Sequence, residues 1–248
     1  MTVSVVTVTY NAAATVADAV RSVVEQQGDF ALDYHLVDGR STDGTLREIA
    51  PFEDHIAKVT SEPDQGLYDA MNRGVARAKG DIIGILNADD RLADDRVIAD
   101  VLDTFAATDA DGVYADLDYV DAEQGETVTR RWTSGEPGNF RRGWMPPHPT
   151  LFVRKELYEQ HGLFNLNLRS AADYELMLRF FHFRGAALAY LPRVTVKMRA
   201  GGQSNASLSN RIKANAEDAK AWRLNGAKPP TLLRLQKPLR KLGQFGGR

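Results

Sequence analysis

The most constraining feature of this sequence is an alternation of β-branched runs with helical patterns over its first 120 residues. Val3–Thr9 reads VSVVTVT, which is typical of a buried strand. Apolar residues then recur at helical spacing at Val16, Val20 and Val23, and this pattern ends near Gly28. Strands that alternate with helices predict an α/β fold, in which helices cover both faces of a mostly parallel sheet. The other elements expected here are strands over 34–38, 57–61, 81–87 and 112–120, helices over 67–78 and 97–105, and a short helix after the turn at 39–44.

The pattern changes after Val120. A hairpin around Gly125 is expected to end at Trp132, and residues 134–149, rich in Gly, Pro and Trp, are expected to form a loop. An amphipathic helix is expected over 171–183, because its apolar side chains share one face. The remaining expected elements are a return to the sheet over 150–153, a short helix over 155–161, strands over 188–191 and 194–198, and a helix over 207–224.

Composition excludes several classes of protein. The 248-residue chain has no cysteine, which excludes a disulfide framework, a cysteine-ligated metal site and a thiol nucleophile. Its 43% hydrophobic content and net charge of −2 exclude a disordered chain. No G-x-G-x-x-G follows the first strand, and the chain has neither a P-loop nor a G-x-S-x-G motif. These absences argue against a Rossmann dehydrogenase, a P-loop NTPase and an α/β-hydrolase.

Polar side chains stand at the carboxyl ends of three of the expected strands. Ligands of open α/β sheets bind beyond the carboxyl ends of the strands, so these side chains are expected to share a site. A turn or a helix cap would explain any one of them, and Asn11 could cap the first helix. Clustered carboxylates after a buried strand cost stability unless they are neutralised, so the group predicts a site for a cation and a polar ligand. Its members are Thr9, Tyr10 and Asn11 at the end of the first strand, Asp38 at the end of the second, and Asn87, Asp89 and Asp90 at the end of the fourth.

Five ordered motifs, VSVVTVTYNA, VDGRSTDGT, EPDQGLYDAMNRGVARAKGD, ILNADD and SAADYELMLR, resemble those of glycosyltransferase family 2. This family consists of inverting transferases with the GT-A fold that use nucleotide-diphospho-sugars. The resemblance covers residues 1–205 and implies a Rossmann-like catalytic domain, with a nucleotide-sugar part over 1–120 and an acceptor part over 121–205. A helical, basic extension would follow over 206–248. The stretches PPHPTLFVRKELYEQHGLFN and RAGGQSN resemble a subgroup that acts in polysaccharide or glycolipid assembly.

The resemblance also implies roles for single residues around the donor. Asp38 would read the base of the nucleotide. Asn87-Ala88-Asp89 stands where the family has its D-x-D motif, with Asn as the first member. Asn87 can still accept a hydrogen bond from ribose, and Asp89 would ligate Mg²⁺ or Mn²⁺, while Asp90 is more simply a cap or a supporting residue. The positions implied to contact the nucleotide-sugar are Thr9, Tyr10, Asn11, Asp38, Asp64, Asn87 and Ala88.

Asp173 matches the general base of the family, although Ala172 stands where an acidic residue is usual. An aspartate in the first turn of a helix is otherwise explained by the helix dipole. The base would take the proton of an acceptor hydroxyl as that oxygen attacks the anomeric carbon, in one inverting displacement. A metal on Asp89 would stabilise the charge that builds on the diphosphate. His148 and Arg199 are candidates for contacts with the acceptor or the diphosphate, and a loop histidine and a simple turn are the plainer alternatives.

The implied function is a metal-dependent inverting transfer of sugar from a nucleotide-diphospho-sugar to a hydroxyl of a glycan or lipid-linked acceptor. Two alternatives stay open. Asn87 in the D-x-D position is compatible with a non-catalytic subunit that binds nucleotide-sugar. A sugar-phosphate nucleotidyltransferase should carry a basic, glycine-rich loop after the first strand, which Thr9-Tyr10-Asn11-Ala12 is not.

The charges divide along the chain. Residues 197–248 hold 12 Lys/Arg and 2 Asp/Glu, whereas the first 196 residues hold 19 and 31. Leucines interleave with basic residues over 228–248, a pattern that suits contact with an anionic membrane surface. The near-neutral total argues against nucleic acid as a partner, and a homo-oligomer stays possible. Neither a signal peptide nor a transmembrane stretch is evident, so we expect a cytoplasmic protein, with the cytoplasmic face of the membrane as a second possibility.

Overall fold

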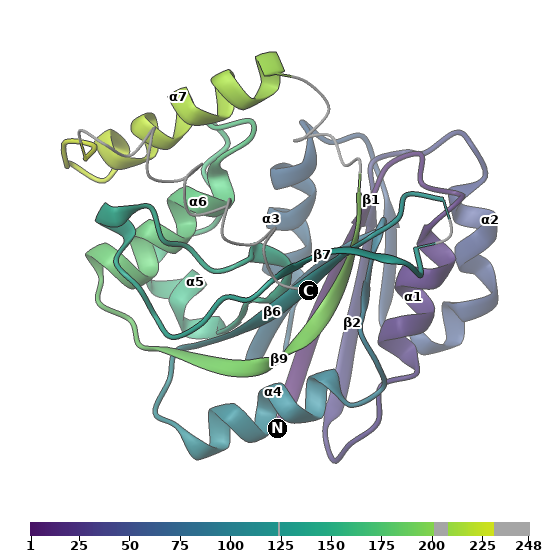
Figure 1. Cartoon of the computed structure of the whole chain (residues 1–248). Coiled ribbons are helices and arrows are strands. Elements are labelled where there is room, and N and C mark those ends of the chain that lie inside the picture. The colour runs from purple at the N-terminus through teal and green to yellow at the C-terminus, as the bar shows by residue number, and fades with distance from the viewer. Residues whose placement is uncertain (124, 201–207, 231–248) are drawn as a thin grey trace.

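The computed structural model of this chain describes residues 1–123, 125–200 and 208–230. One sheet runs through the molecule, with helices on both faces (Figure 1). Its strands are β1 (Thr2–Thr9), β2 (Ala31–Asp38), β3 (Lys58–Ser61), β4 (Ile82–Asn87), β5 (Asp90–Leu92), β6 (Gly112–Val120), β7 (Val128–Trp132), β8 (Phe152–Arg154) and β9 (Leu188–Arg199). The α-helices are α1 (Val16–Val24), α2 (Thr45–Ile49), α3 (Leu67–Arg77), α4 (Val97–Ala107), α5 (Lys155–His161), α6 (Ala172–Met177) and α7 (Leu208–Leu224).

Parallel pairing forms the N-terminal half of the sheet. The strand order is β3-β2-β1-β4-β8-β6-β9-β5, with β7 paired to β6. Strands β1, β2, β3 and β4 pair in parallel with one another, as the alternation of strands and helices predicts. From β8 onward the sheet is mixed, because β8 is antiparallel to both β4 and β6, while β6 and β9 are parallel. The expected α/β class is confirmed, and the departure from parallel pairing lies in the second half of the chain.

Alternate side chains of the strands enter two apolar cores. Val5 and Ile82 pack on the side of α1 and α4, and Val6 and Ile83 pack on the side of α3, α5 and α6. Strand residues point to opposite faces in turn, so the continuous apolar runs of β1 and β4 fill both cores. In Figure 1, α4 lies in front of the sheet and α3 behind it. Trp222 of α7 is fully buried in the second of these cores.

Three elements differ from the sequence expectation. The two strands expected over 188–191 and 194–198 are one strand, β9, whose register with β6 shifts around Pro192. A bulge accommodates proline there, because proline has no N–H to donate to the ladder. The strand β5 was not expected, since Asp90–Leu92 is polar and forms a strand only by pairing with β9. The helix expected over 171–183 is α6 followed by a π-helical turn, η4 (Leu178–Phe183).

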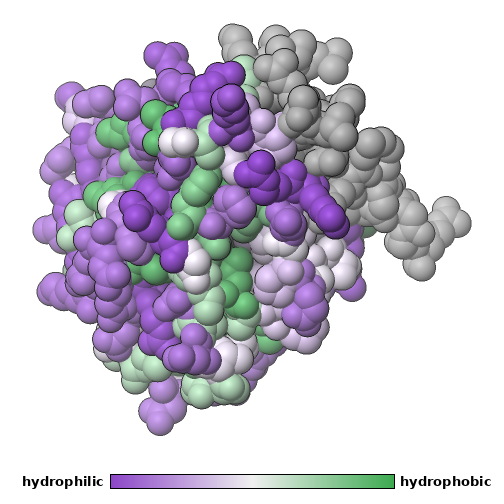
Figure 2. All heavy atoms as spheres, turned by 90° about the vertical axis from the view of Figure 1, so that its left-hand side faces the viewer, coloured by the Kyte–Doolittle hydropathy of each residue, from purple (hydrophilic) through white to green (hydrophobic). Residues whose placement is uncertain are grey.

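The loop over 134–149 is as expected, apart from two short 3₁₀ turns, η2 (Phe140–Arg142) and η3 (His148–Thr150), the second of which continues to the residue after the loop. A further 3₁₀ turn, η1 (Ala50–His55), follows α2. Within the described ranges, no helix is long and apolar enough to cross a membrane. Figure 2 shows that the face on the left of Figure 1 is largely hydrophilic, with apolar side chains in its middle. Most of the basic stretch 228–248, from residue 231 on, lies outside the described residues.

Candidate active site

The carboxyl ends of β1, β2 and β4 meet at one edge of the sheet. Thr9 pairs with Asp38 across β1 and β2, and Val8 pairs with Asn87 across β1 and β4. The backbone N–H of Ala88 continues the ladder by donating to the carbonyl oxygen of Val8 at 3.2 Å. Parallel pairing therefore brings together the strand-end residues that the sequence singles out.

The Asp38 carboxylate is fully buried and organises this edge. It accepts hydrogen bonds from the Ser41 backbone N–H at 3.0 Å and the Ser61 hydroxyl at 2.6 Å, and a third from the Ser41 hydroxyl. A carboxylate offers about four acceptor sites, so three of them hold the loop after β2 to the end of β3. In the structure Asp38 is an anchor of this loop.

Asn11 joins the loops after β1 and β2 rather than capping a helix. Its side-chain oxygen accepts from the Thr42 N–H at 2.9 Å, and its own N–H donates to the Ser41 hydroxyl at 2.8 Å. Asn11 has a φ of 48°, a left-handed conformation that asparagine tolerates better than most residues. The residue at the N-cap of α1 is Thr15, so the expectation that Asn11 caps this helix is wrong.

Tyr10, Gly39 and Asp64 are neighbours at the mouth of the site. A Cβ atom on Gly39 would lie 2.6 Å from a carboxylate oxygen of Asp64 and 3.3 Å from the Tyr10 ring. Only glycine therefore allows this approach. The Tyr10 side chain is 62% exposed, and the other Asp64 oxygen accepts from the Gly66 N–H at 2.8 Å. An exposed ring and a carboxylate thus stand side by side above the strand ends.

Three buried oxygen atoms at this edge have no hydrogen-bond partner among the described residues: Thr9 Oγ1, Asn87 Oδ1 and Asp90 Oδ1. Asn87 Nδ2 donates to the other Asp90 oxygen at 3.2 Å. Burial, and after it the charge of Asp89, raise the pKa of the Asp90 carboxyl well above its ordinary value. Unpartnered buried polar atoms are costly, so their concentration beside Asp89 points to a polar ligand or cation at this edge.

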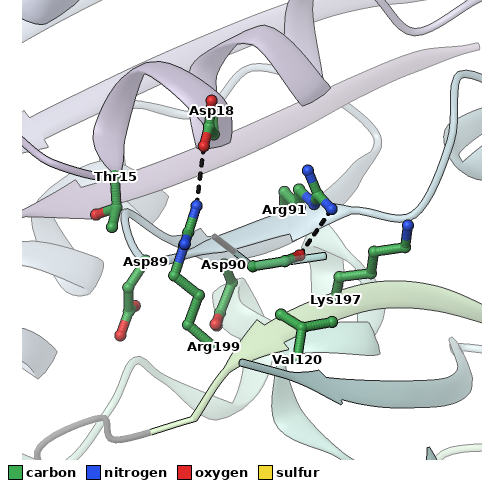
Figure 3. Close-up of a pocket in the computed structure, with 9 residues that line it drawn as sticks. Thr15, Asp18, Asp89, Asp90, Arg91, Val120, Lys197 and Arg199 are labelled. Atoms are coloured by element: carbon green, nitrogen blue, oxygen red, sulfur yellow. Dashed lines mark hydrogen bonds and ion pairs between the residues drawn. The ribbon is translucent and has the colours of Figure 1, made fainter. Parts of the chain in front are cut away.

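Asp89 is half-buried and lines a small pocket with Asp90, Asp18 and basic side chains. Arg199 extends from β9 to Asp18 on α1, with a distance of 2.9 Å between Nη2 and the carboxylate (Figure 3). The same guanidinium donates to the Glu123 carbonyl oxygen at 3.2 Å. Arg199 thus lies at the end of a strand, not in the turn that the sequence allowed. No cluster of three or more His, Cys, Asp or Glu side chains with metal-ligand geometry occurs in the part of the chain that the structure describes.

Asp173, the expected base, is the second residue of α6 and accepts a 3.1 Å hydrogen bond from the Tyr68 hydroxyl. His148 is half-buried nearby. Burial lowers the pKa of the His148 imidazole, against the opposing charge of Asp173, so the neutral form is favoured. His148 therefore lies within electrostatic reach of Asp173. Sequence reasoning missed Tyr68, because nothing in the order of residues connects it with α6.

The sequence model described as glycosyl transferase family 2 matches residues 4–185. A PGL/p-HBAD biosynthesis glycosyltransferase of Mycobacterium tuberculosis is 34% identical over 210 residues, which cover 82% of this chain and 78% of that protein. An uncharacterized glycosyltransferase of the same species is 30% identical over 185 residues, which cover 72% of this chain and 68% of that protein. These matches extend well beyond the individual motifs.

Solved structures share the fold. The complex of Staphylococcus aureus TarS with UDP-GlcNAc superposes with a TM-score of 0.69 at 16% identity, over 99% of this chain and 78% of TarS. The mannosyltransferase PcManGT of Pyrobaculum calidifontis, in complex with GDP-Man and Mn²⁺, gives 0.66 at 20% identity, over 98% and 69%. At such identities the likeness concerns the fold alone, which is of the GT-A type. The family model and the curated relatives together show that the chain belongs to glycosyltransferase family 2 and is a glycosyltransferase.

Proposed function

We propose that this enzyme transfers a sugar from a nucleotide-diphospho-sugar to an acceptor hydroxyl with inversion, and that Asp173 is the general base. The observation that carries the assignment is the environment of Asp173: its carboxylate accepts a hydrogen bond from the Tyr68 hydroxyl at 3.1 Å, within electrostatic reach of His148. A base must be ionised and held within reach of the hydroxyl whose proton it takes. A single displacement needs no nucleophilic side chain, which agrees with a chain that lacks cysteine.

We propose that the edge formed by β1, β2 and β4 holds the donor. Tyr10 offers an exposed ring face beside the Asp64 carboxylate, and the unpartnered oxygens of Thr9 and Asn87 could accept hydrogen bonds from a base or ribose. TarS and PcManGT, which share the fold, are named in complexes with UDP-GlcNAc and GDP-Man. Asp38 would act here through the loop that it anchors. The proposed donor residues are Thr9, Tyr10, Asn11, Asp38, Asp64, Asn87 and Ala88.

A divalent cation fits the oxygen atoms around Asp89. Mg²⁺ and Mn²⁺ prefer oxygen ligands, and Mg²⁺ commonly takes one or two carboxylates together with substrate phosphates. The Asp89 carboxylate, with the unpartnered Asn87 and Asp90 oxygens beside it, supplies such atoms. We propose that Asp89 ligates the ion, which when bound would stabilise the charge on a departing diphosphate. Mn²⁺ is also named in the PcManGT complex.

We propose that the acceptor approaches Asp173 from the part of the chain over 121–205, and that it is a glycan or a lipid-linked glycan. His148, neutral and next to Asp173, would contact it. Arg199 is placed beside Asp89 and is proposed to act on the diphosphate side. The names of the mycobacterial relatives refer to PGL/p-HBAD biosynthesis.

The basic extension is proposed to bring the enzyme to an anionic membrane surface. Residues 228–248 carry six Lys/Arg and no acidic residue. Each basic residue near such a surface contributes about 1 kcal/mol. Deleting residues 229–248 should therefore abolish co-sedimentation with anionic liposomes, and unchanged co-sedimentation would overturn the proposal.

Replacement Asp173→Asn tests the base assignment. The variant keeps the size of the side chain and loses its basicity, so the transfer rate should fall by about 10²–10⁴-fold. Donor affinity, measured by calorimetry, should change little because the donor residues lie on other elements. Asp109→Asn, at an exposed aspartate between α4 and β6, is the matched control and should keep the wild-type rate. Full transfer activity in Asp173→Asn would refute the assignment.

A further inference from the structure

The geometry points to a positioning residue for the base. Tyr68, the second residue of α3, is 8% exposed, and its hydroxyl donates to Oδ1 of Asp173 at 3.1 Å. We propose that this phenol positions the Asp173 carboxylate, holding it in one orientation to take the proton of the acceptor hydroxyl. The inference rests on the proposed function, in which Asp173 is the base.

The environment of the Tyr68 phenol favours its protonated form. Burial, and after it the charge and hydrogen bond of Asp173, raise the pKa of the Tyr68 hydroxyl far above its ordinary value. The phenol can therefore only donate to the carboxylate. A hydrogen bond donated to a carboxylate favours its ionised form over its protonated form. Tyr68 thus stabilises the form of Asp173 that can accept a proton.

The ring of Tyr68 is held by Phe164, which is itself bound to α3. It stacks on Phe164, with ring centroids 5.6 Å apart and an interplanar angle of 21°. Asn72, one turn further along α3, donates to the Phe164 carbonyl oxygen at 2.9 Å and accepts from the Phe164 N–H at 2.8 Å. Because residues at i and i+4 lie on one helix face, α3 holds both Tyr68 and the ring that supports it.

The start of α3 is also held in place. The Asp69 carboxylate accepts from the Gln65 N–H at 3.0 Å and from Arg73 at 2.8 Å. Gly66 precedes the helix with a φ of +114°, a conformation that L side chains rarely adopt. Tyr68 therefore projects toward α6 from a fixed helix terminus rather than from a loop.

The other ionisable groups near α6 do not replace Tyr68. His148 contacts the edge of Phe164, with centroids 5.9 Å apart, and burial favours its neutral form. Glu175 on α6 is paired with Arg179, and Glu217 on α7 accepts from the backbone of residues 169–170. Among the described residues, Tyr68 is the side chain that donates to Asp173. The remaining ionisable groups on η4 and on residues 216–224 of α7 are His182, Asp218, Lys220 and Arg223.

Replacement Tyr68→Phe removes the hydroxyl and keeps the ring on Phe164. The kcat of transfer should fall roughly tenfold, and the KM for the donor should stay within about twofold, because the lost contact lies on the base. The acidic limb of the kcat–pH profile reports the base of the enzyme–substrate complex. It should move up by about one pH unit, since a hydrogen bond to a charged group has this effect.

Tyr34→Phe is the matched control. Tyr34 is fully buried and donates one hydrogen bond, at 2.9 Å, to the Thr7 hydroxyl in the other core. Removing the Tyr34 hydroxyl should leave the kcat–pH profile unchanged. An inactive Asp173→Asn together with a wild-type pH profile in Tyr68→Phe, whatever its kcat, would overturn the role of Tyr68 and leave the proposed function standing. An active Asp173→Asn would instead remove the proposed base itself.

Discussion

At the scale of single residues, Asn87 is the position where this chain departs most informatively from a D-x-D pattern. Its amide nitrogen donates to Asp90, a carboxyl that is 1% exposed. A second carboxylate at this position would remove that donor and bring another negative charge against a buried acid. Asn87 therefore stabilises the edge formed by β1, β2 and β4 when no cation is bound there.

We predict that Asn87→Asp makes stability depend on a divalent cation. Without metal, the free energy of unfolding should fall by about 1–3 kcal/mol, because Asp90 loses its hydrogen bond. Adding Mn²⁺ should restore more stability to the variant than to the wild type, since a second carboxylate improves an oxygen site. Urea denaturation with Mn²⁺ and with EDTA measures both effects.

The control for this prediction is Asn139→Asp, which adds the same charge at an exposed position. Its unfolding should not respond to Mn²⁺ more strongly than that of the wild type. If Asn87→Asp is as stable as the wild type in EDTA, the hydrogen bond from Asn87 to Asp90 does not stabilise the fold.

Single residues also show which parts of the candidate site can be predicted from the sequence. Thr9, Asp38 and Asn87 were predictable as neighbours, because parallel strands place their ends at one edge. Tyr68 was not predictable. It meets Asp173 across 105 positions of sequence, and the meeting depends on how α3 packs near α6. The periodicity of apolar residues predicts which face of a helix is buried, but not which side chains of other elements contact that face.

At the scale of elements, strands and helices with strong patterns were predicted within a few residues, and the exceptions have a common cause. The strand β5 forms because it pairs with β9. The strand β9 is continuous because a bulge in its pairing with β6 accommodates Pro192. The π-helical turn η4 interrupts a pattern that reads as one amphipathic helix. Each exception is decided by partners distant in sequence, which local pattern does not contain.

The helix α7 lies beyond the residues matched by the family model and packs on α6 (Figure 1). Its Glu217 carboxylate accepts from the N–H groups of Arg169 and Ser170, at 3.1 and 2.7 Å. Burial favours a higher pKa for Glu217, but these hydrogen bonds hold it below its ordinary value. Further along α7, the Trp222 indole donates to the Tyr174 hydroxyl at 3.0 Å. The helix thus holds the segment on both sides of Asp173.

We predict that Glu217→Ala destabilises the protein by about 1–3 kcal/mol, because two backbone N–H groups lose their acceptor. The transfer rate should also fall, since residue 170 lies three positions before Asp173. Thermal denaturation and initial rates measure the two effects. Glu156→Ala, at an exposed glutamate of α5, is the control and should change neither. A Glu217→Ala variant with wild-type stability and rate would mean that α7 packs on α6 without supporting it.

At the scale of the whole molecule, the proposed site takes its groups from two regions of the chain. The edge of β1, β2 and β4 carries Asp89 and the unpartnered oxygens, whereas Asp173 lies on a helix from the second half of the chain. Because the donor groups and the proposed base lie on different elements, donor binding can be measured apart from catalysis. A ligand of the first region should stabilise the fold whether or not the second region can carry out chemistry.

We predict that one nucleoside diphosphate, added with Mn²⁺, raises the melting temperature of the whole chain. A ligand at about 100 times its Kd stabilises a native state by about 2.7 kcal/mol, and a protein of this size gains roughly 2–4 °C per kcal/mol. UDP, GDP and dTDP should therefore be compared in thermal shift with Mn²⁺ and with EDTA. The shift should persist in Asp173→Asn, because the base lies outside the donor edge, and should shrink in Asp89→Ala, because the carboxylate proposed to hold the ion is gone. A full shift in Asp89→Ala, or no shift above that of Mn²⁺ alone for any of the three nucleotides, would show that the donor edge does not bind as proposed.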